Sequence, residues 1–338
     1  MKTESMVPPL RARLAAAVAI LTLMLAASVV LSLVIGRQRI DFRAIFSDPF
    51  ARTLFFRLRL PRVLLGLLVG ASLAVVGAAL QALFRNPLAD PYTLGVQGGG
   101  TLGASIAIGL GWSARIFGIP LVFLAAFAGA IFAVLIVKTI ASTGMVVLPG
   151  ALLLAGVVVN LITGALVVAI QYVVDPSAAL NILRWIVGSL DVVGLEPVGH
   201  MFLLLVPAWV ALLALGRQLH LMAIDEDTAA TLGVNVAQCE RLVHVLCSFI
   251  VGVTVAMGGS IGFVGLIVPH AVRLMFGEDL RIVLPGSLLL GGGFLALADA
   301  LGRSVLPTSE LPVGAITGLL GGPVFLWLLR RRQQYSSM

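Results

Sequence analysis

Apolar stretches of about 20 residues recur along almost the whole chain, with only short polar breaks between them. A helix needs roughly that many residues to cross the hydrocarbon core of a bilayer. Of the 338 residues, 60% are hydrophobic and 11% are charged, whereas about 25% are charged in an average soluble domain. We therefore predict an all-α, polytopic membrane protein, with room for a soluble segment only at residues 36–57.

Hydropathy, charged residues and proline-rich breaks predict about ten membrane-spanning helices, which form a single transmembrane domain over residues 1–338. The predicted spans are 14–35, 62–83, 93–111, 116–137, 150–172, 200–216, 238–258, 261–276, 282–302 and 312–329. The third and eighth are short and interrupted by glycine, which is typical of tilted, broken or partly inserted segments. A cleaved signal peptide is the alternative for the first run. Its length and the absence of a clear small-x-small cleavage site favour a retained span.

The distribution of lysine and arginine predicts the orientation, because these residues gather on the cytoplasmic side of membrane spans. An even number of spans places both termini on one side, and both termini are basic, so we expect cytoplasmic ends. Twelve of the 22 basic residues are then cytoplasmic, and seven of the other ten lie in the first external loop. Those seven are Arg37, Arg39, Arg43, Arg52, Arg57, Arg59 and Arg62. The preference of basic residues for the cytoplasmic side does not explain the charge of this loop, so the loop must carry its arginines for another reason.

The most informative polar segment is MAIDEDTAATLGVNVAQCERL, residues 222–242. The carboxylates of residues 225–227 suit the free amides at a helix start, residues 228–232 can form a short helix, and Gly233 can end it in a left-handed conformation. Such a helix is too small to fold alone. It is either a docking element for a partner or a solvated connector.

Prolines mark two further positions. Residues 80–100, LQALFRNPLADPYTLGVQGGG, contain two prolines that form a stiff elbow. His270 follows Pro269 in an apolar run and is interpreted as a structural histidine. The sequence contains no phosphate-binding P-loop. The net charge of +7 is scattered rather than gathered in a basic domain, so no nucleic acid partner is expected. Ion-coupled secondary transporters, the alternative class, usually bury carboxylates within their spans, and Asp299, near the outer end of the ninth span, gives that class only limited support.

Five segments in order resemble the permease subunits of ABC importers for vitamin B12, haem and ferric siderophores, the FecCD-like family. They are RLPRVLLGLLVGASLAVVGAALQALFRNPLADP, LLLAGV, DTAATLGVNV, GFVGLIVPHAVRL and ELPVGAITGLLGGPVFLWLL. The resemblance implies a type II ABC importer permease with ten helices, which works as a homodimer in the bacterial inner membrane. It also implies two cytoplasmic ATPase subunits and a periplasmic or lipid-anchored substrate-binding protein.

The resemblance also implies roles for particular residues. Those in the loop 222–237 that match an ATPase-coupling helix are Asp225, Glu226, Asp227, Thr228, Ala229, Ala230, Leu232, Gly233 and Val234. Asn86, Leu88, Pro149 and Gly150 match positions at a cytoplasmic gate, and Arg59, Arg62 and Arg303 match positions that dock the binding protein. No catalytic residue, metal site or cofactor is expected in this chain, because ATP and Mg²⁺ would bind the partner ATPase.

These inferences favour a transport subunit that moves an iron chelate or cobalamin and performs no covalent chemistry itself. The substrate cannot be chosen among haem, ferric siderophore and cobalamin, because the spans offer no distinctive set of ligands. A membrane anchor or receptor that transports nothing is the third class of function.

Overall fold

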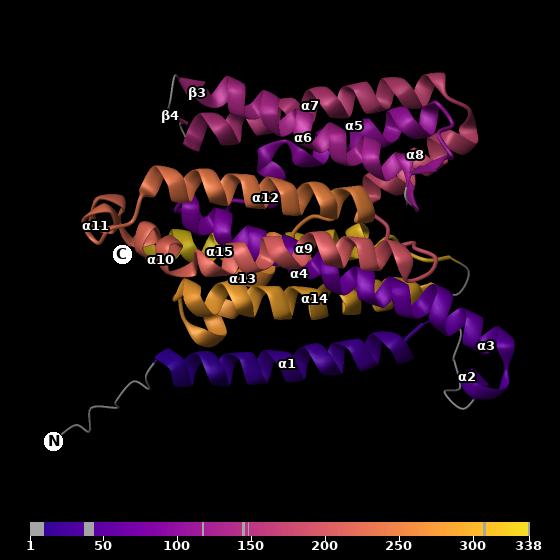
Figure 1. Ribbon diagram of the computed structural model, residues 1–338, viewed down its shortest axis with the longest axis horizontal. Helices are drawn as coiled ribbons and strands as arrows, with labels where there is room; N and C mark the ends of the chain where they lie inside the picture. The colour runs from indigo at the N-terminus through magenta and orange to yellow at the C-terminus, as the bar shows by residue number, and fades with distance from the viewer. Residues whose placement is uncertain are drawn as a thin grey trace.

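The computed structural model describes residues 10–36, 44–116, 118–143, 146–147, 149–306 and 309–336, which form one helical bundle (Figure 1). Within these residues, seven helices are long and apolar enough to cross a membrane. They are α1 (Leu10–Val34), α4 (Leu60–Leu83), α6 (Leu121–Ala141), α7 (Pro149–Val173), α9 (Glu196–Ala214), α12 (Val236–Gly258) and α14 (Leu280–Val305). The chain is therefore a multi-pass membrane protein.

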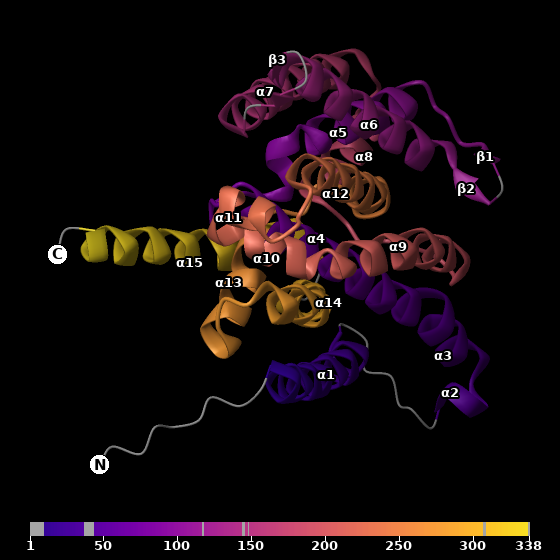
Figure 2. The same cartoon turned by 60° about the vertical axis from the view of Figure 1, so that its left-hand side comes forward.

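The other three predicted spans also form helices. The third and eighth are α5 (Val96–Gly109) and α13 (Val264–Phe276), with only 14 and 13 residues, so the prediction that both are short is confirmed. The last is α15 (Val313–Ser336), which runs away from the bundle at its C-terminal end (Figure 2).

Several short elements were not predicted. They are α2 (Ala44–Ser47), α3 (Pro49–Thr53), a π-helical turn (Leu54–Arg59), a 3-10 turn (Pro91–Leu94), α8 (Pro176–Val187) and α10 (Gly216–Ile224). Two antiparallel hairpins pair β1 (Arg115–Ile116) with β2 (Ile119–Pro120) and β3 (Ser142–Thr143) with β4 (Val146–Val147). The first hairpin occupies the start of the predicted span 116–137, so the helix begins at Leu121 instead. The short helix α11 (Glu226–Thr231) matches the prediction.

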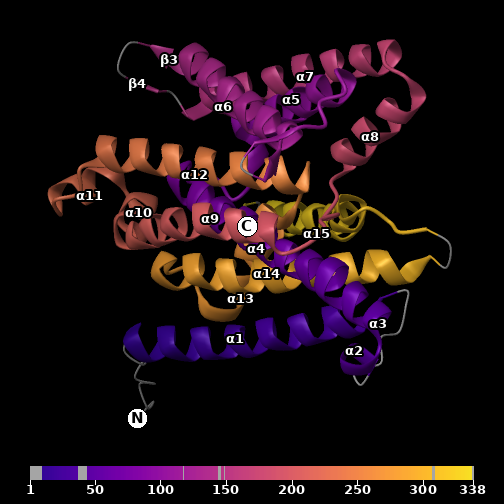
Figure 3. The ribbon, with the colours of Figure 1, turned by 45° about the vertical axis from the view of Figure 1, so that its right-hand side comes forward.

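Helix α4 lies at the centre of the bundle and contacts α14, α12, α13 and α9 (Figures 1 and 3). Of its most apolar 18-residue window, 89% is buried, whereas only 11% is buried in α1, which lies at the rim against α14. Small residues let helix backbones approach closely where lipid gives no hydrophobic drive for packing. This explains the glycines and alanines along α4.

The bundle has two opposite ends. One end carries α11 and the start of α1, and we call it the α11 end; the other carries α2 and α3, and we call it the α3 end (Figure 1). Helix α8 ends inside the bundle, where Ser189 donates its backbone N–H to the carbonyl of Gly258 at 3.0 Å. Residues between α8 and α9 then return to the α3 end.

The contact between α4 and α13 depends on two glycines. A Cβ added at Gly77 would lie 2.1 Å from the carbonyl oxygen of Gly265. We expect Gly77→Ala to lower the unfolding free energy by about 1–3 kcal/mol, because the two backbones must separate. Gly164→Ala is the control, since an added Cβ there meets nothing within 4 Å. Unfolding of both variants in detergent measures this, and equal stability would contradict the close-approach argument.

Candidate functional site

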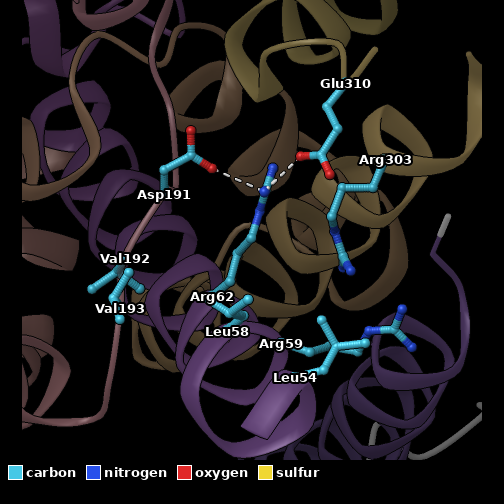
Figure 4. Close-up of a pocket in the computed structure, with 9 residues that line it drawn as sticks. All are labelled: Leu54, Leu58, Arg59, Arg62, Asp191, Val192, Val193, Arg303 and Glu310. Carbon is cyan, nitrogen blue, oxygen red and sulfur yellow. Dashed lines mark hydrogen bonds and ion pairs between the residues drawn. The ribbon is translucent and has the colours of Figure 1, made fainter. Parts of the chain in front are cut away.

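At the α3 end, one arginine binds three carboxylates of the same chain. Arg62 of α4 donates from Nε and Nη2 to Asp299 of α14, at 3.0 and 2.9 Å. Its Nη1 donates to Asp191 at 2.9 Å and to Glu310 at 2.7 Å, and Figure 4 shows this nitrogen between the two carboxylates. Asp191 follows α8 and Glu310 precedes α15. The guanidinium therefore joins four segments of the fold.

Two further arginines lie beside Arg62 and bind the last turn of α1. Arg303 donates to Asp299 at 2.8 Å and to the carbonyl of Ser32 at 3.2 Å. Arg59 donates to the carbonyl of Leu33 at 3.1 Å. Both arginines are buried, with exposed fractions of 5% and 7%. Their charges suit this position, because the carbonyls at a helix C-terminus carry partial negative charge.

The helix that carries these arginines is irregular at the α3 end. Pro61 has no N–H, so the carbonyl of Arg57 lacks its usual partner in the helix. That carbonyl instead accepts a hydrogen bond from the backbone N–H of Gly194 at 2.9 Å. The π-helical turn Leu54–Arg59 precedes this point, and such turns frequently occur at functional sites. The loop that carries Asp191 is thereby held against the start of α4.

The predicted docking arginines, Arg59, Arg62 and Arg303, line one pocket of about 600 Å³, with Leu54, Leu58, Val192 and Val193 completing much of its wall (Figure 4). Their convergence from two distant segments agrees with the sequence interpretation. However, Asp191, Asp299 and Glu310 supply three carboxylates for the three cations. The docking role stays a prediction, but this surface is not a patch of unpaired positive charge.

At the opposite end, α11 has the caps that its sequence predicts. The extended residue Asp225 accepts the backbone N–H of Thr228 at 2.7 Å, and Gly233 follows the helix with φ of 85°. Hydrogen bonds from Thr228, first from its side chain and then from its backbone, lower the pKa of Asp225. Because the pKa is lowered, the capping charge persists at neutral pH and is lost only when the pH falls through that lowered value.

The surface around α11 is largely exposed and partly apolar. Ala229 is the buried residue of the helix, and Ile224 and Leu232 on either side are 67% and 58% exposed. Leu232 also lines a cavity of about 320 Å³, together with Val234 and residues of α10 and α12. Exposed apolar groups outside the spans are typical of a protein contact surface. Among the other predicted coupling residues, Asp227, Thr228, Ala230 and Gly233 are exposed, and Glu226 is half-buried.

The elbow that carries the predicted gate residues binds α11 directly. Arg85 forms an ion pair with Glu226 of α11 and has φ of 47°, a left-handed conformation. Asn86 accepts the backbone N–H of Leu88 through its side-chain oxygen at 3.0 Å, which fixes the turn. Leu88 is 39% exposed. The structure therefore joins the predicted gate segment to the predicted coupling helix.

The second pair of predicted gate residues begins α7. Gly150 is exposed, and a Cβ added there would meet nothing within 4 Å. Pro149 begins the helix, but its side chain lies outside the described part of the structure. A gate role for Pro149 and Gly150 therefore stays a prediction.

The sequence interpretation missed a polar junction inside the bundle. Asn160 of α7 donates to the carbonyl of Tyr92 at 2.9 Å and accepts the backbone N–H of Gly98 at 2.9 Å. The Tyr92 hydroxyl accepts the backbone N–H of Ile261 at 2.6 Å. These bonds hold the start of α5 against α7 and the break between α12 and α13. A lone asparagine in an apolar run is the signal that could have located this junction, whereas no local pattern marks Asp191 or Glu310.

Comparisons with known proteins agree with one another. The FecCD transport family matches residues 23–331. The hemin transport system permease protein HmuU of Yersinia pestis is 38% identical over 310 residues, covering 89% of this chain and 91% of that protein. The cobalamin import system permease protein BtuC of Halobacterium salinarum is 42% identical over 284 residues, covering 84% and 75%. A solved metal-chelate type ABC transporter in an inward-facing conformation matches with a TM-score of 0.81 and 32% identity, covering 94% and 99%.

Proposed function

This chain belongs to the FecCD transport family, and from that premise we propose that it is the membrane-spanning permease subunit of an ATP-driven importer. The observation that carries the proposal is the match in fold to an ABC transporter over 94% of the chain. The cargo is an iron chelate, either haem or a ferric siderophore, or cobalamin. The names of relatives that import hemin, cobalamin and iron chelatin support this group of substrates.

The partners follow from the two ends of the bundle. We propose that the α11 end faces the cytoplasm and contacts a separate ATPase, while the α3 end faces outward and receives a substrate-binding protein. The basic residues near both chain ends support this orientation. A second copy of the chain and two ATPase subunits complete the transporter. ATP and Mg²⁺ bind those partners, and this chain supplies the path and the moving elements.

Movement begins at α11 in this mechanism. ATP binding and hydrolysis change the separation of the two copies of α11, because the ATPase holds different positions in its two states. The ion pair between Glu226 and Arg85 carries the displacement to the elbow, and Asn86 and Leu88 move with it. An equilibrium between inward-open and outward-open states shifts only if a partner binds the two states differently. The rigid turn at Asn86 keeps the displacement from being lost in a flexible loop.

An ion-coupled carrier is the second class of function, and it would depend on Asp299. This carboxylate is 1% exposed, and both of its oxygens accept hydrogen bonds from arginine. A transported cation would therefore have to compete with two guanidinium groups at Asp299. The geometry favours a structural role for this residue.

Two treatments, vanadate and an ionophore, distinguish an ATP-driven importer from an ion-coupled carrier. They are applied to proteoliposomes that contain the chain, its partner ATPase and the binding protein. We expect vanadate to stop cargo uptake, because it traps the ATPase, and we expect uptake to continue when an ionophore collapses the membrane potential. Uptake measured with radiolabelled cobalamin or with haem absorbance tests this. The opposite pattern would favour the ion-coupled carrier. Absence of flux under every energy source would indicate an anchor or receptor.

A further inference from the structure

Helices α6, α9 and α12 line an apolar cavity of about 190 Å³ in the half of the bundle next to the α3 end. Helix α12 packs against both other helices and lies between them (Figures 1 and 2). Apart from His200, every residue that lines the cavity is apolar. An engineered apolar cavity of about 150 Å³ stays free of water and binds benzene. The natural occupant of this cavity is therefore an apolar group.

The position of the cavity identifies the bilayer as the source of that group. All three helices are long and apolar enough to cross a membrane. Leu204 of α9 lines the cavity and is also 47% exposed, so the cavity opens on the apolar outer surface of the bundle. Phe249, at its inner end, lies nine residues before the end of α12 at Gly258. Nine residues span about 14 Å of helix, and each half of the hydrocarbon core is about 15 Å thick. An acyl chain of the leaflet at the α3 end matches this depth.

One polar group in the cavity needs a partner. Nδ1 of His200 is enclosed and has no hydrogen-bond partner in the part of the chain that the structure describes. Burial of such a nitrogen without a partner is unfavourable. A neutral imidazole can donate a hydrogen bond from Nδ1, and the ester carbonyl of a phospholipid can accept it. His200 lies in the second turn of α9, near the α3 end, where an acyl chain joins its ester group.

The rim of the cavity has one charge of each sign. Glu196 and His200 are four residues apart, which places them on one face of α9. A Cβ added at Gly118 would collide with the Glu196 carboxylate and would lie 3.7 Å from Cε1 of His200. Arg115 lies opposite Pro120 in the β1–β2 hairpin, and Pro120 lines the cavity. Both charged residues are exposed. A headgroup that has both a phosphate and an amine can form charge-assisted hydrogen bonds with the two of them.

We propose that this cavity is a binding site for phosphatidylethanolamine. One acyl chain fills the space between α6 and α9, and its ester carbonyl accepts a hydrogen bond from His200. The phosphate pairs with Arg115, and the ammonium group pairs with Glu196. Phosphatidylglycerol has no amine, so its binding leaves Glu196 without a cation. The inference goes beyond the proposed function, because neither the cargo nor ATP takes part in it.

Native mass spectrometry tests the site on the full chain, taken from vesicles of equal parts phosphatidylethanolamine and phosphatidylglycerol into detergent. We expect the wild-type chain to retain phosphatidylethanolamine. His200→Phe should lower the retained fraction about fivefold, because one hydrogen bond is lost. His200→Gln should recover most of it, since the amide nitrogen also donates. Glu196→Gln should lower the preference for phosphatidylethanolamine over phosphatidylglycerol about two- to fivefold.

Two neighbouring leucines provide a matched variant and control. Leu204→Trp places an indole in the mouth of the cavity and should lower lipid retention about tenfold, because the acyl chain no longer fits. Leu203 is 69% exposed and does not line the cavity, so Leu203→Trp should stay within about twofold of wild type. Size-exclusion chromatography checks that both variants fold.

Three results would overturn the lipid site. They are equal retention by Leu204→Trp and Leu203→Trp, equal amounts of the two lipids on the wild-type chain, and a wild-type chain that retains detergent but no lipid. Loss of a dimer in Leu204→Trp, with no change in bound lipid, would assign the cavity to a second copy of the chain instead.

Discussion

Replacement of residues 225–233 by a Gly/Ser linker of equal length is expected to abolish ATPase association and transport, while the chain still inserts into the membrane. The caps at Asp225 and Gly233 hold α11 in one shape, with Ile224 and Leu232 exposed beside it. A flexible linker would have to be ordered on binding, at roughly 1–2 kcal/mol for each residue. An interface with a micromolar Kd has a binding free energy of only about 8 kcal/mol. The cost of ordering a few linker residues would therefore cancel most of that binding free energy.

A graded series of variants tests whether the shape of α11 is what matters. Asp225→Asn keeps a side-chain oxygen that can cap the helix, so transport should stay close to wild type. Asp225→Ala removes the cap and should reduce transport without abolishing it. Pull-down of the partner ATPase and cargo uptake in proteoliposomes are measured for each variant. Undiminished transport by the linker variant would contradict the coupling role of α11.

Sequence patterns predict those parts of the fold that depend on neighbouring residues. The long spans follow from runs of apolar residues, and α11 follows from a carboxylate before the helix and a glycine after it. Helix α8 was missed because it has only 12 residues and carries Arg184, so no window of about 20 apolar residues marks it. The start of α6 was misplaced because the hairpin that includes Gly118, with φ of 78°, is itself apolar.

The partners of the docking arginines could not be predicted for a different reason. Arg62 lies 129, 237 and 248 residues from Asp191, Asp299 and Glu310 along the chain. Helical periodicity relates residues three or four apart, so it identifies only the pair of Asp299 and Arg303 on α14. The sequence therefore shows only that the α3 end has more basic residues than the orientation rule explains. Only the structure shows that carboxylates of the same chain already bind Arg62 and Arg303.

Loss of charge at Asp299 is expected to have the largest effect of any single substitution at the α3 end. Asp299→Asn should lower the unfolding free energy by about 3–5 kcal/mol, because it leaves buried cations without a counter-charge. Arg303 would then retain only the carbonyl of Ser32 among its described partners. Arg62 would retain Asp191 and Glu310, which are exposed. Chemical unfolding of the purified chain in detergent measures the loss.

Two comparisons distinguish a lost ion pair from a lost ion-transport site. Glu310→Gln breaks an exposed pair of the same arginine and should cost only about 0–1 kcal/mol. Asp299→Leu combined with Arg303→Met removes the buried carboxylate and one of its two cations and should recover part of the stability, because apolar groups can replace a buried ion pair, while Arg62 keeps only Asp191 and Glu310. A carrier that binds its ion at Asp299 would behave differently, since Asp299→Asn would fold like wild type and lose only flux. Equal unfolding of Asp299→Asn and Glu310→Gln would contradict the structural role, because it would mean that Arg62 and Arg303 do not depend on the buried carboxylate.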